Sequence, residues 1–244
     1  MAKVSAPRAS AGGSPDPVRL HAAVREARDD AAPFALTAAV ILVVLALVSR
    51  FAGWELLGHR VWWIWLVVAG PYLCLSATLL FGVGRLVRHD RRREIVIALL
   101  AFVWLFNVLG LVVVVVSLVA HSGGHIAGRQ LLFEGGSVWF TDAIAFGLAF
   151  WELDCGGPVA RALATGPRKP DFQFPQDENP QLAREGWAPR IWDYFYVSLT
   201  NSIAFSPTDA MPLTRRAKAL MSAGSMLSAV TVLLVTARAV NILA

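Results

Sequence analysis

Three adjacent polar residues, Thr200, Asn201 and Ser202, stand near the end of a half-apolar segment, 191–205. Their hydroxyl and amide oxygens could hold a cation, because oxygens of this kind replace an ion's hydration shell in channel filters. If the segment is a helix, the cluster lies at its C-terminal end, where the peptide dipoles also favour positive charge. Further oxygen-bearing side chains follow the cluster: Ser206, Thr208 and Asp209. These residue types indicate a cation site.

The segment 191–205 is too short to cross a membrane as a helix. Its residues would reach about 22 Å at a rise of about 1.5 Å each, whereas the hydrocarbon core of a bilayer is about 30 Å thick. Pro207 and the polar residues around it then end the helix. Irregular backbone at membrane depth is tolerated only where protein buries it or where it lines a watery cavity. We therefore predict a re-entrant half-helix at a permeation or binding site, followed by a spanning helix over 217–242.

This order of short helix, broken loop and long helix resembles the pore module of the potassium-channel superfamily. The resemblance is carried by the aromatic helix start 193–196 (DYFY), the helix end 198–200 (SLT) and the run 209–215 (DAMPLTR). In such channels an acidic residue follows the filter, and a Pro-x-Thr leads into an inner helix that often opens with arginine. The same stretch also looks like the C-terminal part of an uncharacterised bacterial integral-membrane family. The resemblance covers residues 191–244 and nothing before them.

The stretch that would be the filter departs from the potassium-channel pattern. Where a potassium filter has Thr-Val-Gly-Tyr-Gly, residues 202–208 read SIAFSPT, without glycine and with a proline. A ring of aligned carbonyls needs backbone angles that glycine accepts and that Ala, Phe and Pro do not. We therefore predict a cation-conducting pore that is not selective for K⁺, and the permeant ion stays open.

Asp209 is the counterpart of the acidic residue that braces a potassium-channel filter from behind. Arg215 and Arg216 follow at the start of the last span, close enough in the chain to fold back and pair with it. The alternative is an Asx-type turn, in which Asp209 bonds only nearby backbone and the arginines face lipid headgroups. Both interpretations stay open.

The last span is rich in small residues. Ser225, Ser228 and Thr236 could wet a pore. Gly224 and Ser228 also form a small-xxx-small pair, which lets helices approach closely. Close packing explains these residues without a permeant ion, and pore lining remains the second interpretation.

Two polar residues fall inside earlier apolar stretches. Asp142 lies inside the fourth span, and an ionisable group there is a functional-site candidate unless it reaches water at the interface. Asn107 in the third span is typical of a hydrogen bond between helices, or less often of a ligand-binding residue. His121 and His125 are separated by two glycines, which argues against a helix that would aim both at one metal. We expect no metal and no cofactor.

Composition indicates a membrane protein. Of 244 residues 56% are hydrophobic and 16% charged, against about 25% charged in soluble domains. The net charge of +5 indicates arginines at membrane faces in contact with lipid, rather than nucleic-acid binding. The sequence carries no phosphate-binding loop, no Gly-x-Ser-x-Gly motif and no paired metal motif, so we do not expect an enzyme.

The predicted fold is an all-α polytopic membrane protein with about five transmembrane helices and a re-entrant half-helix, or with six spans. A partly disordered tail covers 1–32, a four-helix transmembrane region 33–155, a proline-rich linker 156–190, and the pore-like segment 191–244. Within the second of these regions the predicted spans are 34–51, 61–87, 95–120 and 131–153.

The arginines set the predicted orientation. Arg85, Arg88, Arg91, Arg92 and Arg93 crowd the second connection, which the positive-inside bias makes cytoplasmic. The N-terminus is then cytoplasmic as well, in what the family resemblance implies is a bacterial cytoplasmic (inner) membrane. The half-helix would enter from the cytoplasmic side and leave the C-terminus outside. Alternatively, 191–213 crosses completely and both termini are cytoplasmic.

Three function classes remain. The first is an ion channel formed by a homo-oligomer, a tetramer by resemblance, because one chain supplies too little to enclose a pathway. The second is a non-conducting membrane scaffold with a degenerate pore module. The third is a small-solute transporter, which the broken helix and Asp142 favour and the lack of a visible internal repeat disfavours.

Overall fold

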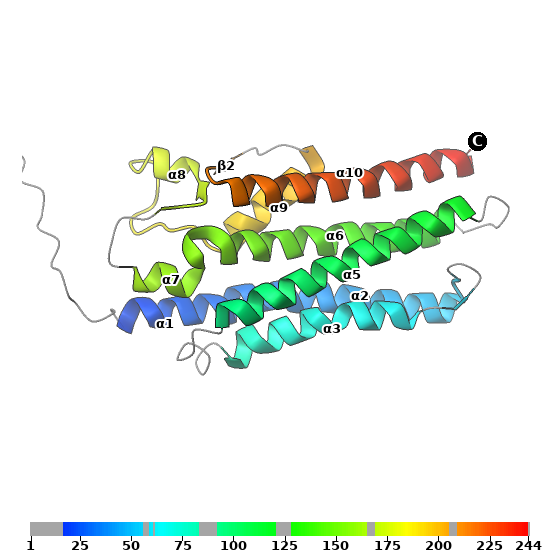
Figure 1. The fold of residues 1–244 in the computed structure, drawn as a ribbon, viewed down its shortest axis with the longest axis horizontal. Helices are drawn as coiled ribbons and strands as arrows, with labels where there is room; N and C mark the ends of the chain where they lie inside the picture. Colours follow the sequence, from blue (N-terminus) through cyan, green and yellow to red (C-terminus); the bar gives the residue numbers. More distant parts are fainter. Residues whose placement is uncertain are drawn as a thin grey trace, which may run out of the picture.

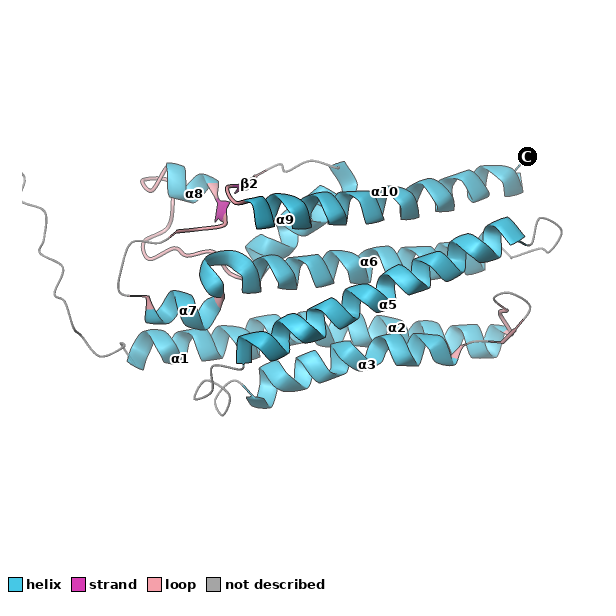
Figure 2. Ribbon diagram, viewed as in Figure 1, coloured by secondary structure: helices cyan, strands magenta, loops and turns pink. Residues whose placement is uncertain are grey.

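The structure, a computed structural model, describes residues 17–55, 59–60, 62–82, 92–120, 128–164, 169–204 and 209–243. Helices make up most of these residues (Figure 2), which confirms the predicted all-α class. The long helices lie side by side along the long axis of the molecule (Figure 1).

The long elements are as follows. The first helix runs without a break through α1 (Pro17–Arg25), η1 (Glu26–Ala31) and α2 (Ala32–Ala52). The second runs through α3 (Trp63–Ala77) and η2 (Thr78–Gly82). The others are α5 (Arg92–Ala120), α6 (Gly128–Leu153) and α10 (Arg215–Leu243).

In the part of the chain that the structure describes, four helices are long and apolar enough to cross a membrane. They are His21–Ala52, Trp63–Phe81, Arg93–Val112 and Arg215–Ala237. Helices of this length and hydropathy fit the membrane protein expected from composition. The first of them has 32 residues, about 48 Å, so roughly 18 Å must project beyond a 30 Å hydrocarbon core. The projecting part is its charged beginning, because residues 34–51 are apolar apart from Arg50 near their end.

The fourth predicted span, α6, is not one of these four helices. It is the central helix and packs against α2, α5, α9 and α10. Every residue from Thr141 to Glu152 is buried. A helix surrounded by protein can carry polar side chains where a lipid-facing helix cannot, provided that they find partners. This position explains how α6 can carry Glu134, Asp142 and Glu152 as buried residues.

Short elements gather at one end of the bundle, here called the linker end (Figure 1). They are η3 (Asp154–Gly156), α7 (Pro158–Leu163), β1 (Phe172–Gln173), α8 (Pro175–Glu178) and β2 (Met211–Pro212). β1 and β2 pair antiparallel, with Phe172 opposite Pro212 and Gln173 opposite Met211. The stretch 156–190, predicted as a proline-rich linker, therefore includes two short helices and a strand.

Candidate functional site

The predicted half-helix is α9 (Ile191–Ala204), which has 14 residues and a length of about 21 Å. Its buried residues recur at helical spacing and are Ile191, Tyr194, Val197, Ser198, Asn201 and Ser202. This face lies on α6. The Ser198 hydroxyl donates a 2.8 Å hydrogen bond to the Ala143 carbonyl. At Gly147 a Cβ atom would come within 2.9 Å of the Phe195 Cα, so the glycine permits the close approach of the two helices.

α9 ends beside the middle of α10. The Asn201 amide Nδ2 donates a 3.0 Å bond to the carbonyl of Met221, and the carbonyl of Ser202 accepts a 2.6 Å bond from the Ser228 hydroxyl. α10 continues for another four turns beyond Ser228, to Leu243. The half-helix is therefore embedded in the bundle at its C-terminal end.

The chain then returns to the end where α9 began. The Leu213 amide donates a 2.8 Å bond to the Asp171 carbonyl, and the Thr214 hydroxyl donates a 2.6 Å bond to the Asp171 carboxylate. Asp171 immediately precedes β1 at the linker end. The chain from Ile191 to Thr214 thus begins and ends at the same end of the bundle, and α9 and α10 start there together (Figure 1).

The predicted polar cluster forms a hydrogen-bonded contact between α9 and α10. Asn201, Ser202 and Ser228 are buried, and Ser225 is half-buried. The Ser225 hydroxyl donates a 3.0 Å bond to the Asn201 side-chain oxygen, and the Ser228 hydroxyl accepts a 2.6 Å bond from the indole N–H of Trp139 on α6. These groups hydrogen-bond one another and the neighbouring backbone.

The other predicted residues of the segment stand apart from this contact. Thr200 is half-buried, and among the described residues its hydroxyl bonds carbonyls of its own helix, 2.9 Å from that of Tyr196 and 3.1 Å from that of Val197. Thr236 is exposed on α10. Ser206 and Thr208 lie outside the described residues.

Asp209 and the two arginines are exposed, and no ion pair joins Asp209 to Arg215 or Arg216 among the residues that the structure describes. The backbone amide and hydroxyl that precede α10 bond Asp171 instead. The carboxylate that holds this turn comes from the linker, which the sequence interpretation did not consider.

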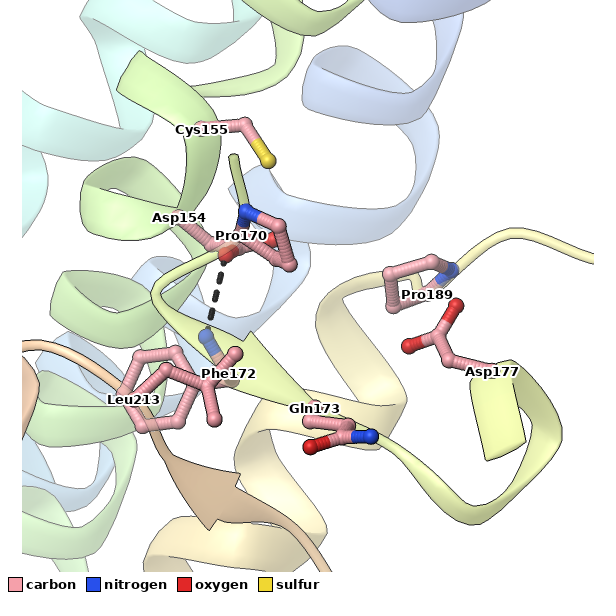
Figure 3. A pocket seen from close by; sticks show the side chains of 8 residues that line it. All are labelled: Asp154, Cys155, Pro170, Phe172, Gln173, Asp177, Pro189 and Leu213. Atoms are coloured by element: carbon pink, nitrogen blue, oxygen red, sulfur yellow. Dashed lines mark hydrogen bonds between the residues drawn. The ribbon is translucent and has the colours of Figure 1, made fainter. Parts of the chain in front are cut away.

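Asp154 anchors the start of α9. One oxygen of its buried carboxylate accepts backbone N–H bonds from Asp171 at 2.7 Å and Phe172 at 3.3 Å, and the other accepts the Tyr194 hydroxyl at 2.6 Å. Figure 3 shows the bond from Phe172. Asp154 directly follows α6 and thereby joins the end of that helix to β1 and α9.

A buried arginine completes this anchor. The side chain of Arg161 on α7 is only 6% exposed, and its Nη1 donates to the carbonyls of Trp151 and Asp154 at 3.0 and 3.1 Å. Its guanidinium lies 3.9 Å from carboxylate oxygens of Asp154 and Glu26, and over the ring of Tyr194 at 5.7 Å. Burial raises the pKa of Glu26, which the hydrogen bond from Trp151 and the charge of Arg161 partly oppose. Nothing in the spacing of these residues predicted their contact.

A small cavity of about 290 Å³ adjoins this anchor (Figure 3). Its lining residues are Asp154, Cys155, Pro170, Phe172, Gln173, Asp177, Pro189 and Leu213. Both oxygens of Asp154 are already engaged, and the structure, over the ranges it describes, has no group of three or more His, Cys, Asp or Glu side chains that could hold a metal.

Asp142 and Asn107, the two predicted intramembrane polar residues, contact each other. Asn107 Nδ2 donates to the Asp142 carboxylate at 2.5 Å and to the Tyr72 hydroxyl at 3.1 Å, and that hydroxyl donates to the Thr141 carbonyl at 2.9 Å. Asp142 is 4% exposed, so it does not reach water at an interface. Its second oxygen has no hydrogen-bond partner among the described residues. The three side chains join α3, α5 and α6.

Fold and composition together are those of a helical protein whose described part includes four helices long and apolar enough to cross a membrane. No family model, curated protein or solved structure matches it.

Proposed function

We propose that residues 191–243 form a re-entrant pore module, in which α9 enters the membrane from the cytoplasmic side and α10 crosses to the outside. The observation that carries the proposal is the return of the chain from Ile191 to Thr214 to one end of the bundle, through the β1–β2 pair and the bonds to Asp171. The length of α9 supports it, since about 21 Å does not reach across a bilayer.

The proposed cation site lies at the C-terminal end of α9. The last carbonyls of a helix lack partners within the helix, and the helix dipole makes this end partially negative. The Ser202 carbonyl is taken by Ser228, but Thr200 bonds only to its own helix and retains oxygen lone pairs for a ligand. The lack of glycine in 202–208 supports conduction without selectivity for K⁺.

A pathway would require several copies of the chain. α9 and α10 leave apolar faces uncovered, with Trp192 63%, Ile203 61% and Leu233 68% exposed. In a symmetric homo-oligomer, a tetramer by analogy with potassium channels, these faces would meet and the ends of the half-helices would converge on the symmetry axis. The orientation in a bacterial inner membrane with a cytoplasmic N-terminus belongs to this proposal.

A second candidate function is a non-conducting scaffold. It is favoured by the polar contact between α9 and α10, because Asn201, Ser225 and Ser228 satisfy one another and need no permeant ion. In a scaffold the cluster would serve only to fix the two helices together.

Flux into liposomes that contain the purified protein tests the proposal. We expect voltage-driven passage of both Na⁺ and K⁺, and Thr200→Val should reduce it several-fold because the variant removes an oxygen near the site while keeping the side-chain shape. Ser198→Ala is the matched control on the same helix, since the Ser198 hydroxyl bonds α6 and faces away from the proposed pathway. Absence of flux in vesicles of verified protein content and oligomer size would reject the channel and leave the scaffold.

A further inference from the structure

Two adjoining cavities form a groove between α5 and α10, with α6 as its floor. The first, about 260 Å³, is lined by Arg93, Ile97, Leu100, Ala101, Trp104, Ala149, Glu152, Leu153, Arg216 and Leu220. The second, about 320 Å³, is lined by Trp104, Val108, Phe146, Ala223, Met226, Leu227 and Val230. Trp104 lines both cavities and stacks on Phe146 at 5.0 Å. Together they are called the α5–α10 groove below.

The groove has the length of one membrane leaflet. From Arg93 to Val108 along α5 there are 15 residue steps, or about 22 Å, and the stretch from Arg216 to Val230 along α10 is similar. Half of a hydrocarbon core of about 30 Å is about 15 Å, and the remainder reaches the headgroup layer. α5 and α10 both contain a stretch long and apolar enough to cross a membrane. In a membrane the groove between these two helices would face lipid.

Charge is confined to one end of the groove. Arg93 and Arg216 are exposed in the first turns of α5 and α10 and line the same cavity. Arg215 and Lys218, exposed in the first turn of α10, add to the positive charge at this end. Glu152 is the acidic residue in the lining, and its side chain is 1% exposed, beneath the arginines. Beyond Trp104 all lining residues are apolar.

We propose that the α5–α10 groove binds an anionic phospholipid, with its phosphate between Arg93 and Arg216 and an acyl chain along Trp104 towards Val230. A basic cluster at the end of an apolar cleft between membrane helices complements such an amphiphile at both ends. A phospholipid of this kind brings its own negative charge to the two exposed arginines, whereas an apolar helix of a second copy would complement the apolar part only. The proposal does not depend on whether the protein conducts ions.

Lipid-dependent thermal stability and native mass spectrometry test this site. Purified protein in mild detergent should unfold at a higher temperature with phosphatidylglycerol than with phosphatidylcholine of the same chains, and inorganic phosphate should have little effect. Replacing both arginines, Arg93→Gln with Arg216→Gln, should weaken phosphatidylglycerol binding roughly 30-fold, since each arginine near an anionic surface contributes a factor of about five. Arg60→Gln is the matched control, because Arg60 is exposed and lies near the start of α3, outside the groove.

A second variant tests the apolar part without touching the charges. Ala223 is exposed in the groove wall, so Ala223→Phe should fill the acyl-chain position and reduce retention of phosphatidylglycerol while leaving the protein folded.

Three results would overturn the proposal: equal stabilisation by phosphatidylcholine, equal stabilisation by inorganic phosphate, or unchanged phosphatidylglycerol binding in Ala223→Phe. If the double arginine variant does not fold, the comparison between Ala223→Phe and Arg60→Gln still decides whether the groove binds phosphatidylglycerol. Conversion of a dimer to a monomer by Ala223→Phe, without loss of lipid, would assign the groove to a second copy instead.

Discussion

At the scale of single residues, the start of α9 is held by polar side chains that the sequence did not single out. Asp154, Arg161 and Tyr194 come from three elements and meet in a buried contact. Breaking a buried pair costs more than forming it gains, because the remaining charge is left without a partner. Their positions in the chain follow no motif spacing, and their proximity arises only when the linker folds back over the end of α6.

Removal of the Tyr194 hydroxyl should destabilise the fold. Tyr194→Phe leaves one oxygen of the buried Asp154 carboxylate without its 2.6 Å donor, and hydrogen bonds to charged groups are worth about 1.5–3 kcal/mol. We expect the free energy of unfolding in detergent to fall by about 2 kcal/mol. Tyr196→Phe on the exposed face of α9 should change it by less than about 0.5 kcal/mol. Equal effects of the two variants would remove Asp154 as the anchor of α9.

At the scale of elements, much of the helix pattern could be predicted from the sequence. The segment predicted over 191–205 is observed as Ile191–Ala204, and the span predicted over 217–242 lies within Arg215–Leu243. The apolar runs and the helix-breaking residue Pro207 were sufficient to predict both segments. The central position of α6 could not be predicted, because a buried polar residue such as Glu152 looks the same in sequence as an interfacial one.

The contact between α9 and α6 depends on one glycine. Gly147→Ala would place a Cβ 2.9 Å from the Phe195 Cα, so we expect a loss of about 1–3 kcal/mol in the free energy of unfolding. Gly136→Ala on the same helix meets no atom within 4 Å and should be neutral or stabilise by about 0.5–1 kcal/mol through helix propensity. Denaturant titration of both variants compares them directly. A Gly147→Ala variant as stable as Gly136→Ala would mean that α9 does not pack as closely as described.

At the scale of the whole molecule, the sequence predicted which polar residues of 191–244 form the candidate site, but not which neighbouring helix each side chain contacts. Asn201, Ser202, Ser225 and Ser228 were all identified, as possible pore lining or as packing residues, and they bond each other across two helices. Their register depends on where the chain after α9 returns, which Asp171 and the β1–β2 pair fix from a distant part of the sequence. The arginine bias supplied the proposed orientation, and the geometry of the linker end supports the re-entrant alternative over a complete crossing.

Labelling from the two sides of the membrane tests the re-entrant segment most directly. Single cysteines at Glu185, Asp209 and Ala244, in a chain with Cys74 and Cys155 replaced by serine, are exposed to a membrane-impermeant thiol reagent in right-side-out and inside-out vesicles. Glu185 precedes α9, and Asp209 follows it near the linker end. We expect positions 185 and 209 to react only from the cytoplasmic side and position 244 only from the outside. Reaction of positions 185 and 209 from opposite sides would contradict it, because α9 would then cross the membrane completely.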